Sequence, residues 1–238
     1  KSEEEDSKEV ASDVQEAEQV DEKLVESNNN VSKQSERQTL NIEYETVTID
    51  ESSESVQFIM EYPKFHIKSL DKAIENLIEE EYQYLSTFNE DSEKLSLEFG
   101  GSYSISSGFS DVFIRDNIAS IVFGFSIYEG GTHPSNYIKT LNYNIESQEI
   151  IEIKSILNGD QQKLERLSEL VSERLMNREG IFYENVPTET EPLWENFSLY
   201  RLTEDSIIIQ FQTYEIGPYS SGIVEIQVAF EELGISSL

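Results

Sequence analysis

Cysteine is absent from all 238 residues of the chain. The chain therefore has no disulfide framework, no thiol nucleophile and no cysteine ligand for zinc. Histidine occurs only twice, at His66 and His133, and neither belongs to an HxxxH, HxH or His–Asp pattern. A phosphate-binding glycine loop, a GxSxG elbow and an EF-hand loop are also missing. We accordingly expect neither a metal nor another cofactor.

Basic residues are scarce, because 17 Lys and Arg stand against 48 Asp and Glu, which gives a net charge of -31. Residues 1–40 hold twelve acidic and five basic residues and carry -7 of that charge, so -24 remains on the rest. Such a chain repels phosphate groups, and we expect no nucleic acid partner. The acidic surface suits a basic protein or a divalent cation, and solubility alone also explains it.

Long apolar runs are missing too, and no stretch approaches the about 20 residues that a membrane-spanning helix needs. The chain begins at Lys1, which is compatible with a removed signal peptide or lipid-anchor segment. We expect the chain to meet a membrane only through such an N-terminal anchor.

The first 40 residues differ in composition from the remainder. Residues 1–40 are rich in Glu, Ser, Gln and Asn and contain no aromatic residue. They bury too little apolar surface to offset the entropy of ordering, so we predict a disordered, flexible acidic tether. The alternative is a helix over Val10 to Val25. Ordered structure is expected from about Ile42 onward.

The apolar periodicity predicts an α+β fold with a mainly antiparallel sheet. Residues 69–88 and 160–178 repeat apolar residues at helical spacing and predict two amphipathic helices packed on the sheet. Ser69 is the expected cap of the first helix, and Asn158 or Asp160 that of the second. A turn at Asp116-Asn117 is expected to join two strands. Strands are predicted over residues 42–49, 55–65, 94–106, 110–117, 118–131, 137–145, 149–157, 197–203, 206–217 and 222–230.

One loop, "GGTHP", holds a glycine pair and one of the two histidines. Gly130 and Gly131 permit a positive φ or close backbone approach, and Pro134 keeps His133 extended. His133 suits a ligand or an acid–base role. It equally suits a turn in which its imidazole bonds a backbone carbonyl.

A second loop, "TYEIGPYSSG", runs from Thr213 to Gly222 between two strongly apolar stretches. Exposed tyrosines on a rigid loop suit contacts with carbohydrate or protein. The alternative is a pair of core tyrosines beside a tight turn. The candidate binding residues in the two loops are Gly130, Gly131, His133, Tyr214, Pro218, Tyr219 and Gly222.

Two stretches of the sequence resemble RsiV-type extracytoplasmic domains. "YEGGTHPSNYIKTLNYNIESQEIIEIKSIL" is similar to the part of that family in which a Gly-Gly-x-His turn leads into two strands. "YEIGPYSSGIVEIQVAF" is similar to its C-terminal segment, and "SVQFIMEYPKF" resembles the companion domain of unknown function that usually precedes it. The resemblance implies a companion domain over residues 41–145 and an RsiV-type C-terminal domain over 146–238, sharing one continuous core.

The resemblance also implies a cellular setting. Such domain pairs are exported and face the bacterial cell wall. In RsiV-like anti-sigma factors they bind lysozyme and gate proteolysis, in peptidoglycan-deacetylase chains they accompany a separate catalytic domain, and many members are lipoproteins. This sequence shows no sigma-binding segment, membrane span or deacetylase domain, so the lysozyme role does not transfer directly.

Three hypotheses follow. The first is a non-enzymatic, extracytoplasmic binding or sensing module of the cell envelope, membrane-anchored or secreted, that recognises a lysozyme-like protein or a cell-wall glycan. The second is a hydrolase of cell-wall polymers that uses His133 with an acidic partner. Among 48 acidic residues paired carboxylates occur by chance, so the sequence does not identify that partner. The third is a structural lipoprotein without a ligand.

Overall fold

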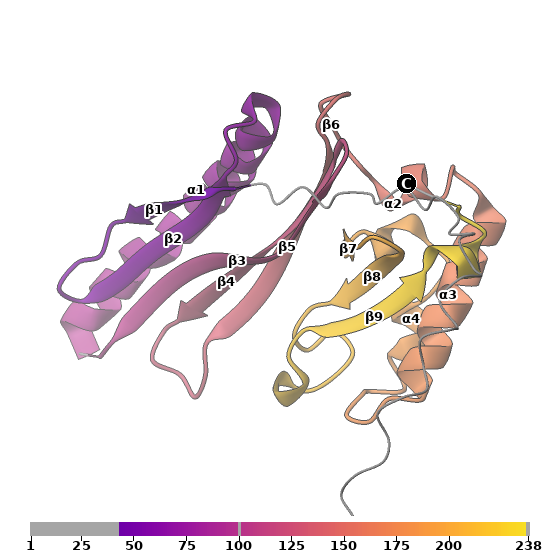
Figure 1. Cartoon of the computed structure of the whole chain (residues 1–238). Coiled ribbons are helices and arrows are strands. Elements are labelled where there is room, and N and C mark those ends of the chain that lie inside the picture. The colour runs from indigo at the N-terminus through magenta and orange to yellow at the C-terminus, as the bar shows by residue number, and fades with distance from the viewer. Residues whose placement is uncertain (1–42, 100, 237–238) are drawn as a thin grey trace, which may run out of the picture. The chain divides into compact units, whose positions relative to one another are not determined.

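The structure, a computed structural model, describes residues 43–99 and 101–236. The predicted tether over residues 1–40 lies outside the described residues. Within them the chain forms nine strands in two mostly antiparallel sheets, with a long amphipathic helix on each (Figure 1). The predicted α+β fold is confirmed.

The first sheet has six strands in the order β1-β2-β3-β4-β5-β6. Its neighbouring strands are antiparallel except β2 and β3, which are parallel because the helix α1 crosses over between them. The turn between β3 and β4 falls at Asp116 and Asn117 as predicted, with Asp116 at φ 51°. The strands are β1 (Glu45–Asp50), β2 (Val56–Lys64), β3 (Tyr103–Arg115), β4 (Ile118–Tyr128), β5 (Ser135–Asn144) and β6 (Glu149–Ile150).

Helix α1 (Lys68–Phe99) covers one face of this sheet. Ile74 and Ile78 lie four residues apart on its buried face. They share a hydrophobic core with the odd-numbered residues of β4, including the fully buried Ile121 and Phe123. The even-numbered residues of β4 and β5 therefore face away from α1.

The second half of the chain places a three-stranded sheet against helix α3. Asp160 caps that helix, since its carboxylate accepts the N–H of Gln162 at 2.9 Å. The sheet order is β7-β8-β9, antiparallel throughout. The elements are α2 (Ile153–Ile156), α3 (Gln161–Met176), α4 (Val186–Glu189), β7 (Tyr200–Leu202), β8 (Ser206–Phe211) and β9 (Val224–Ala229), with 3-10 turns η1 (Trp194–Phe197), η2 (Tyr219–Ser221) and η3 (Phe230–Leu233).

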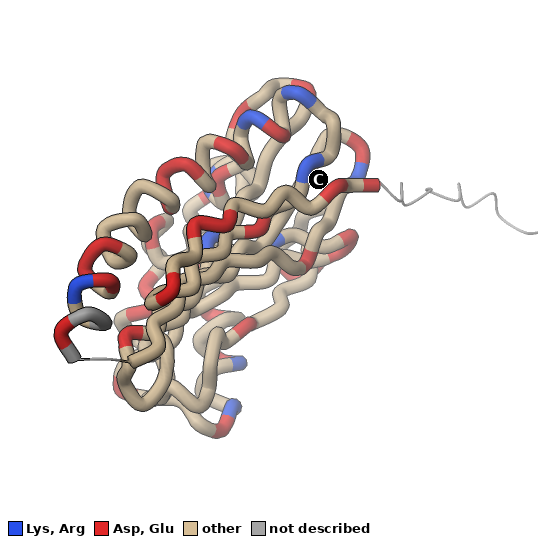
Figure 2. The backbone as a smooth tube through the Cα atoms, turned by 90° about the vertical axis from the view of Figure 1, so that its left-hand side faces the viewer, with Lys and Arg blue, Asp and Glu red and all other residues tan. Residues whose placement is uncertain are grey.

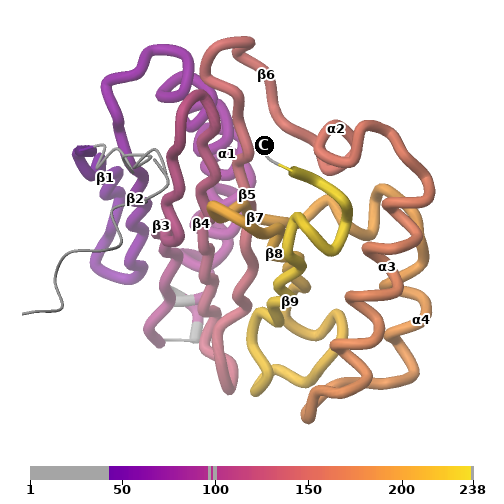
Figure 3. Tube along the Cα trace, turned by 45° about the vertical axis from the view of Figure 1, so that its right-hand side comes forward, coloured from indigo at the N-terminus to yellow at the C-terminus, as the bar shows by residue number. Residues whose placement is uncertain are grey.

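The two sheets meet where β7 lies beside β4 and β5 (Figure 3). The Asn142 amide donates to the Tyr200 carbonyl at 2.7 Å. The Leu202 N–H donates to the Ser120 hydroxyl at 2.8 Å. Asn142 and Ser120 are both buried and come from the face of the first sheet that points away from α1. Buried polar side chains of the first sheet thus satisfy backbone groups of the second.

Two strand predictions were wrong. Residues 94–99 belong to α1, because Leu85, Phe88, Ser92 and Leu95 recur three or four positions apart and continue the helical face, although the local apolar alternation suggested a strand. Over residues 149–157 only the two residues of β6 form a strand. The remainder turns into α2, whose Ile153 and Ile156 enter the second core.

Two further expectations also need correction. Helix α1 begins at Lys68, and the Ser69 hydroxyl donates to the Ile145 carbonyl at 3.4 Å, so Ser69 is not its cap. The last three strands form a separate sheet and do not extend the first, because the edge of β5 is covered by β6 and, at Ile138, by the Gln212 side chain.

Two hydrophobic clusters fill the described part of the chain. One draws its residues from 49–145, and the other from 151–235 together with Phe113 and Ile118. The division into domains at residue 145 stays a prediction. Over the described ranges no helix combines the length and apolar character that crossing a membrane requires.

Candidate functional site

Two loops far apart in sequence meet in a loop cluster made of His133, Asn136, Tyr214 and Tyr219. The loop between β4 and β5 supplies His133, and the loop between β8 and β9 supplies both tyrosines. The hydroxyl of Tyr214 lies 3.0 Å from Nε2 of His133. The ring of Tyr219 stacks on the imidazole, with centroids 3.7 Å apart and an interplanar angle of 16°. The two loops that the sequence singled out thus form one surface.

Side-chain bonds hold the two loops together beneath these rings. Gln212 donates to the carbonyl of Ile138 at 2.8 Å and accepts the N–H of Ile138 at 3.0 Å. Asn136 donates to the Tyr219 hydroxyl at 2.9 Å. A side-chain amide therefore pairs with the edge of β5 as a strand would, and it sets the register between the two loops.

The backbone of the second loop is held in unusual conformations. Tyr214 has φ 72°, a region that bulky residues rarely occupy and that costs about 1–3 kcal/mol. Gly222 has φ 61° and ψ -147°, a combination essentially confined to glycine. The Tyr214 side chain is 55% exposed, so this conformation presents the ring to solvent.

The segment that follows α3, around residues 180–182, contacts the second loop through hydrogen bonds of its backbone groups. The Ser221 hydroxyl donates to the Gly180 carbonyl at 2.8 Å, and the Phe182 N–H donates to the Ile216 carbonyl at 2.8 Å. A Cβ atom at Gly217 would lie 2.9 Å from the Gly180 oxygen. The close approach of the two backbones explains the glycine at position 217.

Glu215 places a carboxyl group inside the same loop. Its side chain accepts the N–H of Gln212 at 2.5 Å, and its carbonyl accepts from the Asn185 amide at 3.0 Å. Burial raises the pKa of the Glu215 carboxyl, the Gln212 N–H opposes that shift, and the charge of Glu189 adds to it.

The structure places each predicted site residue. His133 is exposed, and its Nδ1 lies 3.1 Å from the Pro134 carbonyl oxygen, as expected for a turn histidine. Gly130 has φ 79°, whereas Gly131 has neither a positive φ nor a crowded Cβ position. Pro218 is half-buried and precedes η2, which carries Tyr219. Whether these residues bind a ligand stays a prediction.

The chemistry of a hydrolase needs an acid–base partner for His133. Among the hydrogen bonds and ion pairs of the described residues, none joins His133 to a carboxylate; its ring nitrogens meet Tyr214 and Pro134. Residues 43–99 and 101–236 also contain no group of three or more His, Asp or Glu side chains placed to hold a metal. The described contacts of the cluster are thus those of an aromatic surface, and whether it has catalytic activity stays a prediction.

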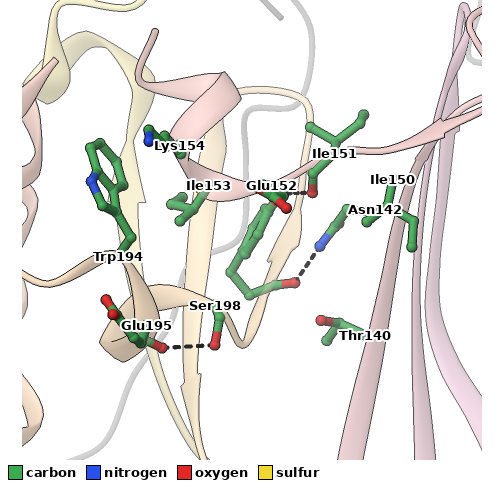
Figure 4. Close-up of a pocket in the computed structure, with 11 residues that line it drawn as sticks. Thr140, Asn142, Ile150, Ile151, Glu152, Ile153, Lys154, Trp194, Glu195 and Ser198 are labelled. Carbon is green, nitrogen blue, oxygen red and sulfur yellow. Dashed lines mark hydrogen bonds between the residues drawn. The ribbon is translucent and has the colours of Figure 1, made fainter. Parts of the chain in front are cut away.

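Sequence reasoning missed a cavity of about 340 Å³ that opens between the two halves of the described fold (Figure 4). Trp194 from η1 lies on one side of it, and Thr140 and Asn142 from β5 lie on the other. Ile150, 67% exposed, stands at its rim. The only tryptophan of the chain, in a loop with two prolines, was the one signal for it in the sequence.

Comparison with known proteins agrees with the fold of the second half. Residues 154–231 match a family model described as "Protein of unknown function (DUF3298)". The match covers α3, the second sheet and the Tyr214–Gly222 loop, and it supports a DUF3298-type domain in this part of the chain.

A curated relative and two solved structures extend the comparison. The peptidoglycan-N-acetylmuramic acid deacetylase PdaC of Bacillus subtilis (strain 168) is 25% identical over 174 residues, which are 72% of this chain and 37% of that protein's length. The chain thus spans little more than a third of that relative. A DUF3298 family protein of Pseudomonas aeruginosa PAO1 aligns with TM-score 0.56 and 15% identity over 81% of this chain and 93% of its own. A second DUF3298 family member, from Bacteroides fragilis NCTC 9343, aligns with TM-score 0.54 and 17% identity over 82% of this chain and 93% of its own. At such identities the similarity to both structures concerns the fold alone.

Proposed function

We propose that this chain is an extracytoplasmic binding module of the bacterial cell envelope, without catalytic activity of its own, that contacts a cell-wall glycan through the loop cluster. The observation that carries the proposal is the stack of Tyr219 on His133 with Tyr214 bonded to the same ring. Rings held in place before binding lose little entropy when a ligand packs on them. Tyrosines offer an apolar face and a polar hydroxyl together, as a sugar surface requires.

The similarity to a protein named as a peptidoglycan deacetylase supports the wall as the location of the ligand. That name describes a larger protein, and the present chain matches only part of it. A module that holds the wall polymer without modifying it fits this partial correspondence. The assignment to the RsiV type, and with it a sensing role, stays a prediction.

Co-sedimentation with purified peptidoglycan sacculi tests the proposal. Tyr219→Ala removes the stacked ring and is expected to weaken binding by about tenfold, as for a central aromatic contact. Tyr84→Ala is the control, because it removes the same type of side chain from an exposed position, 51% accessible, on α1. If both variants are retained equally on sacculi, the loop cluster is not part of the binding surface.

A basic protein, of which lysozyme is an example, is a second candidate partner because of the charge on α1. The helix carries nine acidic residues and three lysines, and Glu75, Glu79 and Glu80 are exposed. Figure 2 shows acidic positions recurring along the outer side of the helix. Such a surface attracts cationic partners in a salt-dependent manner.

Binding to immobilised lysozyme at low salt distinguishes this candidate from the first. Glu80→Lys should weaken an interaction with α1, whereas Glu165→Lys makes the same charge change on the exposed side of α3. If both reversals act equally, only net charge matters and α1 is not a specific surface. A lack of binding at any salt concentration excludes this partner.

Two alternatives predict different results. A wall hydrolase that uses His133 releases soluble fragments from sacculi and loses that activity in His133→Ala. A structural lipoprotein without a ligand binds neither sacculi nor lysozyme. Fragment release measured in parallel with sedimentation separates all three.

A further inference from the structure

The cavity beside Trp194 is separate from the loop cluster, although both adjoin β5. Asn136 belongs to the loop cluster, whereas Thr140 and Asn142 line the cavity four and six residues further along the strand. At 3.3–3.4 Å per residue these positions lie about 13–20 Å from Asn136. The cavity volume, about 340 Å³, falls within the range of small-ligand sites.

Asn142 gives the cavity an unsatisfied buried acceptor. The residue is 3% exposed, and its Nδ2 donates to the Tyr200 carbonyl at 2.7 Å, yet its Oδ1 has no hydrogen-bond partner. The amide orientation is determined, because a carbonyl accepts only and must face the NH₂ group. A buried acceptor without a partner is costly, at about 1–3 kcal/mol. Oδ1 itself is closed off from the cavity in this structure, so a ligand donor would satisfy it after a small movement of the Asn142 amide.

The edge of β5 adds backbone polar groups to the same wall. Ile138 turns its N–H and C=O toward Gln212, and the Asn142 carbonyl accepts the N–H of Ile151 at 2.8 Å. Backbone groups on one side of an antiparallel strand recur every second residue. Thr140, between these two positions, therefore directs its backbone groups to the same side, where the cavity lies.

The opposite side of the cavity is aromatic and apolar. The half-buried indole of Trp194 is one wall, and the isoleucines at 150, 151 and 153 contribute aliphatic surface. Lys154 places its ammonium nitrogen 6.0 Å from the indole centroid. Charged groups occur only near the exposed rim, at Lys154 and at the two glutamates 152 and 195.

We propose that this cavity binds an N-acetylated pyranose of a glycan chain, with the sugar ring against Trp194 and the acetamido N–H donated to Oδ1 of Asn142. An acetamido group unites the two features that the cavity requires, since its N–H is a donor and its methyl group is apolar. The C–H face of a pyranose suits an indole, and its hydroxyl groups suit the polar rim. The inference rests on the proposed function and deepens it by assigning a second, chemically selective site.

Trp194 also provides the measurement, because it is the only tryptophan in the chain. Titration of the full chain with tri-N-acetylchitotriose should change the tryptophan emission saturably. Cellotriose, which has the same pyranose rings without acetamido groups, should not. This comparison needs no variant, so a folding defect cannot obscure it.

Calorimetry on variants then locates the site. Trp194→Phe keeps an aromatic ring and is expected to weaken chitotriose binding by about tenfold. Leu193→Ala is the matched control, since Leu193 is the adjacent residue, 48% exposed, and does not line the cavity. Tyr219→Ala should leave the tryptophan emission response to chitotriose unchanged, because that signal comes from Trp194 and the loop cluster is a different surface.

Each outcome decides between the two proposals. Equal responses to cellotriose and chitotriose overturn the acetamido assignment. Binding to sacculi without any emission response to chitotriose overturns the cavity proposal and leaves the proposed function in place. The same holds if the emission responds only to the free peptide part of peptidoglycan. Chitotriose binding that calorimetry finds weakened about tenfold in Trp194→Phe supports the cavity even if the chain fails to sediment with sacculi, in which case the proposed function fails.

Discussion

The hydroxyl of Tyr214 and Nε2 of His133 lie 3.0 Å apart, although 81 residues separate them in the chain. Each comes from an exposed loop, and each loop begins or ends on a buried strand. The bond therefore depends on how the two sheets pack, because each sheet positions one of the two loops. Its strength and its effect on neighbouring contacts can be measured.

A double-mutant cycle measures that bond directly. Tyr214→Phe and His133→Ala should each reduce the free energy of unfolding by less than about 1 kcal/mol, because both side chains are exposed to water. Their coupling energy in urea denaturation should be about 0.5 kcal/mol and no larger than either single loss. Additive effects would show that the two loops are positioned independently of this contact.

Gln212 should matter more for stability than the exposed rings do. Gln212→Ala removes both bonds to Ile138 and leaves the edge of β5 unpaired there, at a cost of about 1–3 kcal/mol. Gln83→Ala is the control, because that amide is exposed on α1 and bonds only the Glu79 carboxylate. A loss for Gln83→Ala as large as that for Gln212→Ala, measured by urea denaturation, would argue against a bridging role.

Gly217 should not tolerate even one added methyl group. In Gly217→Ala the new Cβ would meet the Gly180 oxygen at 2.9 Å and Ser221 atoms at 3.0 and 3.1 Å, so a loss of about 1–3 kcal/mol in unfolding free energy is expected. Gly124→Ala, on β4, has no atom within 4 Å of the new Cβ and should be neutral or slightly stabilising. Thermal melting of the two variants side by side tests the contrast.

Glu215 should make the protein less stable as the pH rises. Its pKa in the folded state is raised above the unfolded value of about 4.3, so the native state holds the proton more tightly. The stability that protonation contributes is complete below the unfolded pKa and is lost as pH rises through the folded pKa. Glu215→Gln should therefore gain stability relative to the native chain between pH 4 and pH 7.

Glu232 supplies the opposite sign in the same measurement. Its hydrogen bond from Arg174, with a second from the Ala229 N–H, lowers the pKa of the Glu232 carboxyl. That contribution is present above the unfolded pKa and is lost as pH falls through the lower folded value. Glu232→Gln should thus lose stability at pH 7 and approach the native chain at low pH. Profiles of the same sign for the two variants would contradict one of the assignments, and flat profiles would contradict both.

Local sequence patterns identified the elements whose structure depends on near neighbours. The stripe of α3 and its Asp160 cap, the Asp116 turn and the alternation of β5 were all predicted, because each depends on residues within about one turn or one hairpin. The end of α1 was missed. In that segment a few alternating apolar residues suggested a strand. The same segment continues the helical repeat of α1, whose apolar face packs against the first sheet.

The candidate sites divide in the same way. Residue types alone singled out the two loops, since glycine, histidine and tyrosine mark turns and contact surfaces. Nothing in the sequence indicated that the loops meet, or that Asn142, within an ordinary alternating strand, lies opposite Trp194 with a free acceptor.

The sequence by itself therefore determined the elements, the acidic surface and the chemical character of the loops. The tertiary structure alone decided which of these residues share a surface. The physical reason is that the contacts that build the sites, from Asn142 to Tyr200 and from Asn136 to Tyr219, close 58 and 83 residues of chain. Closing loops of that length costs chain entropy, which the packing of the two hydrophobic cores offsets and which no local pattern reveals.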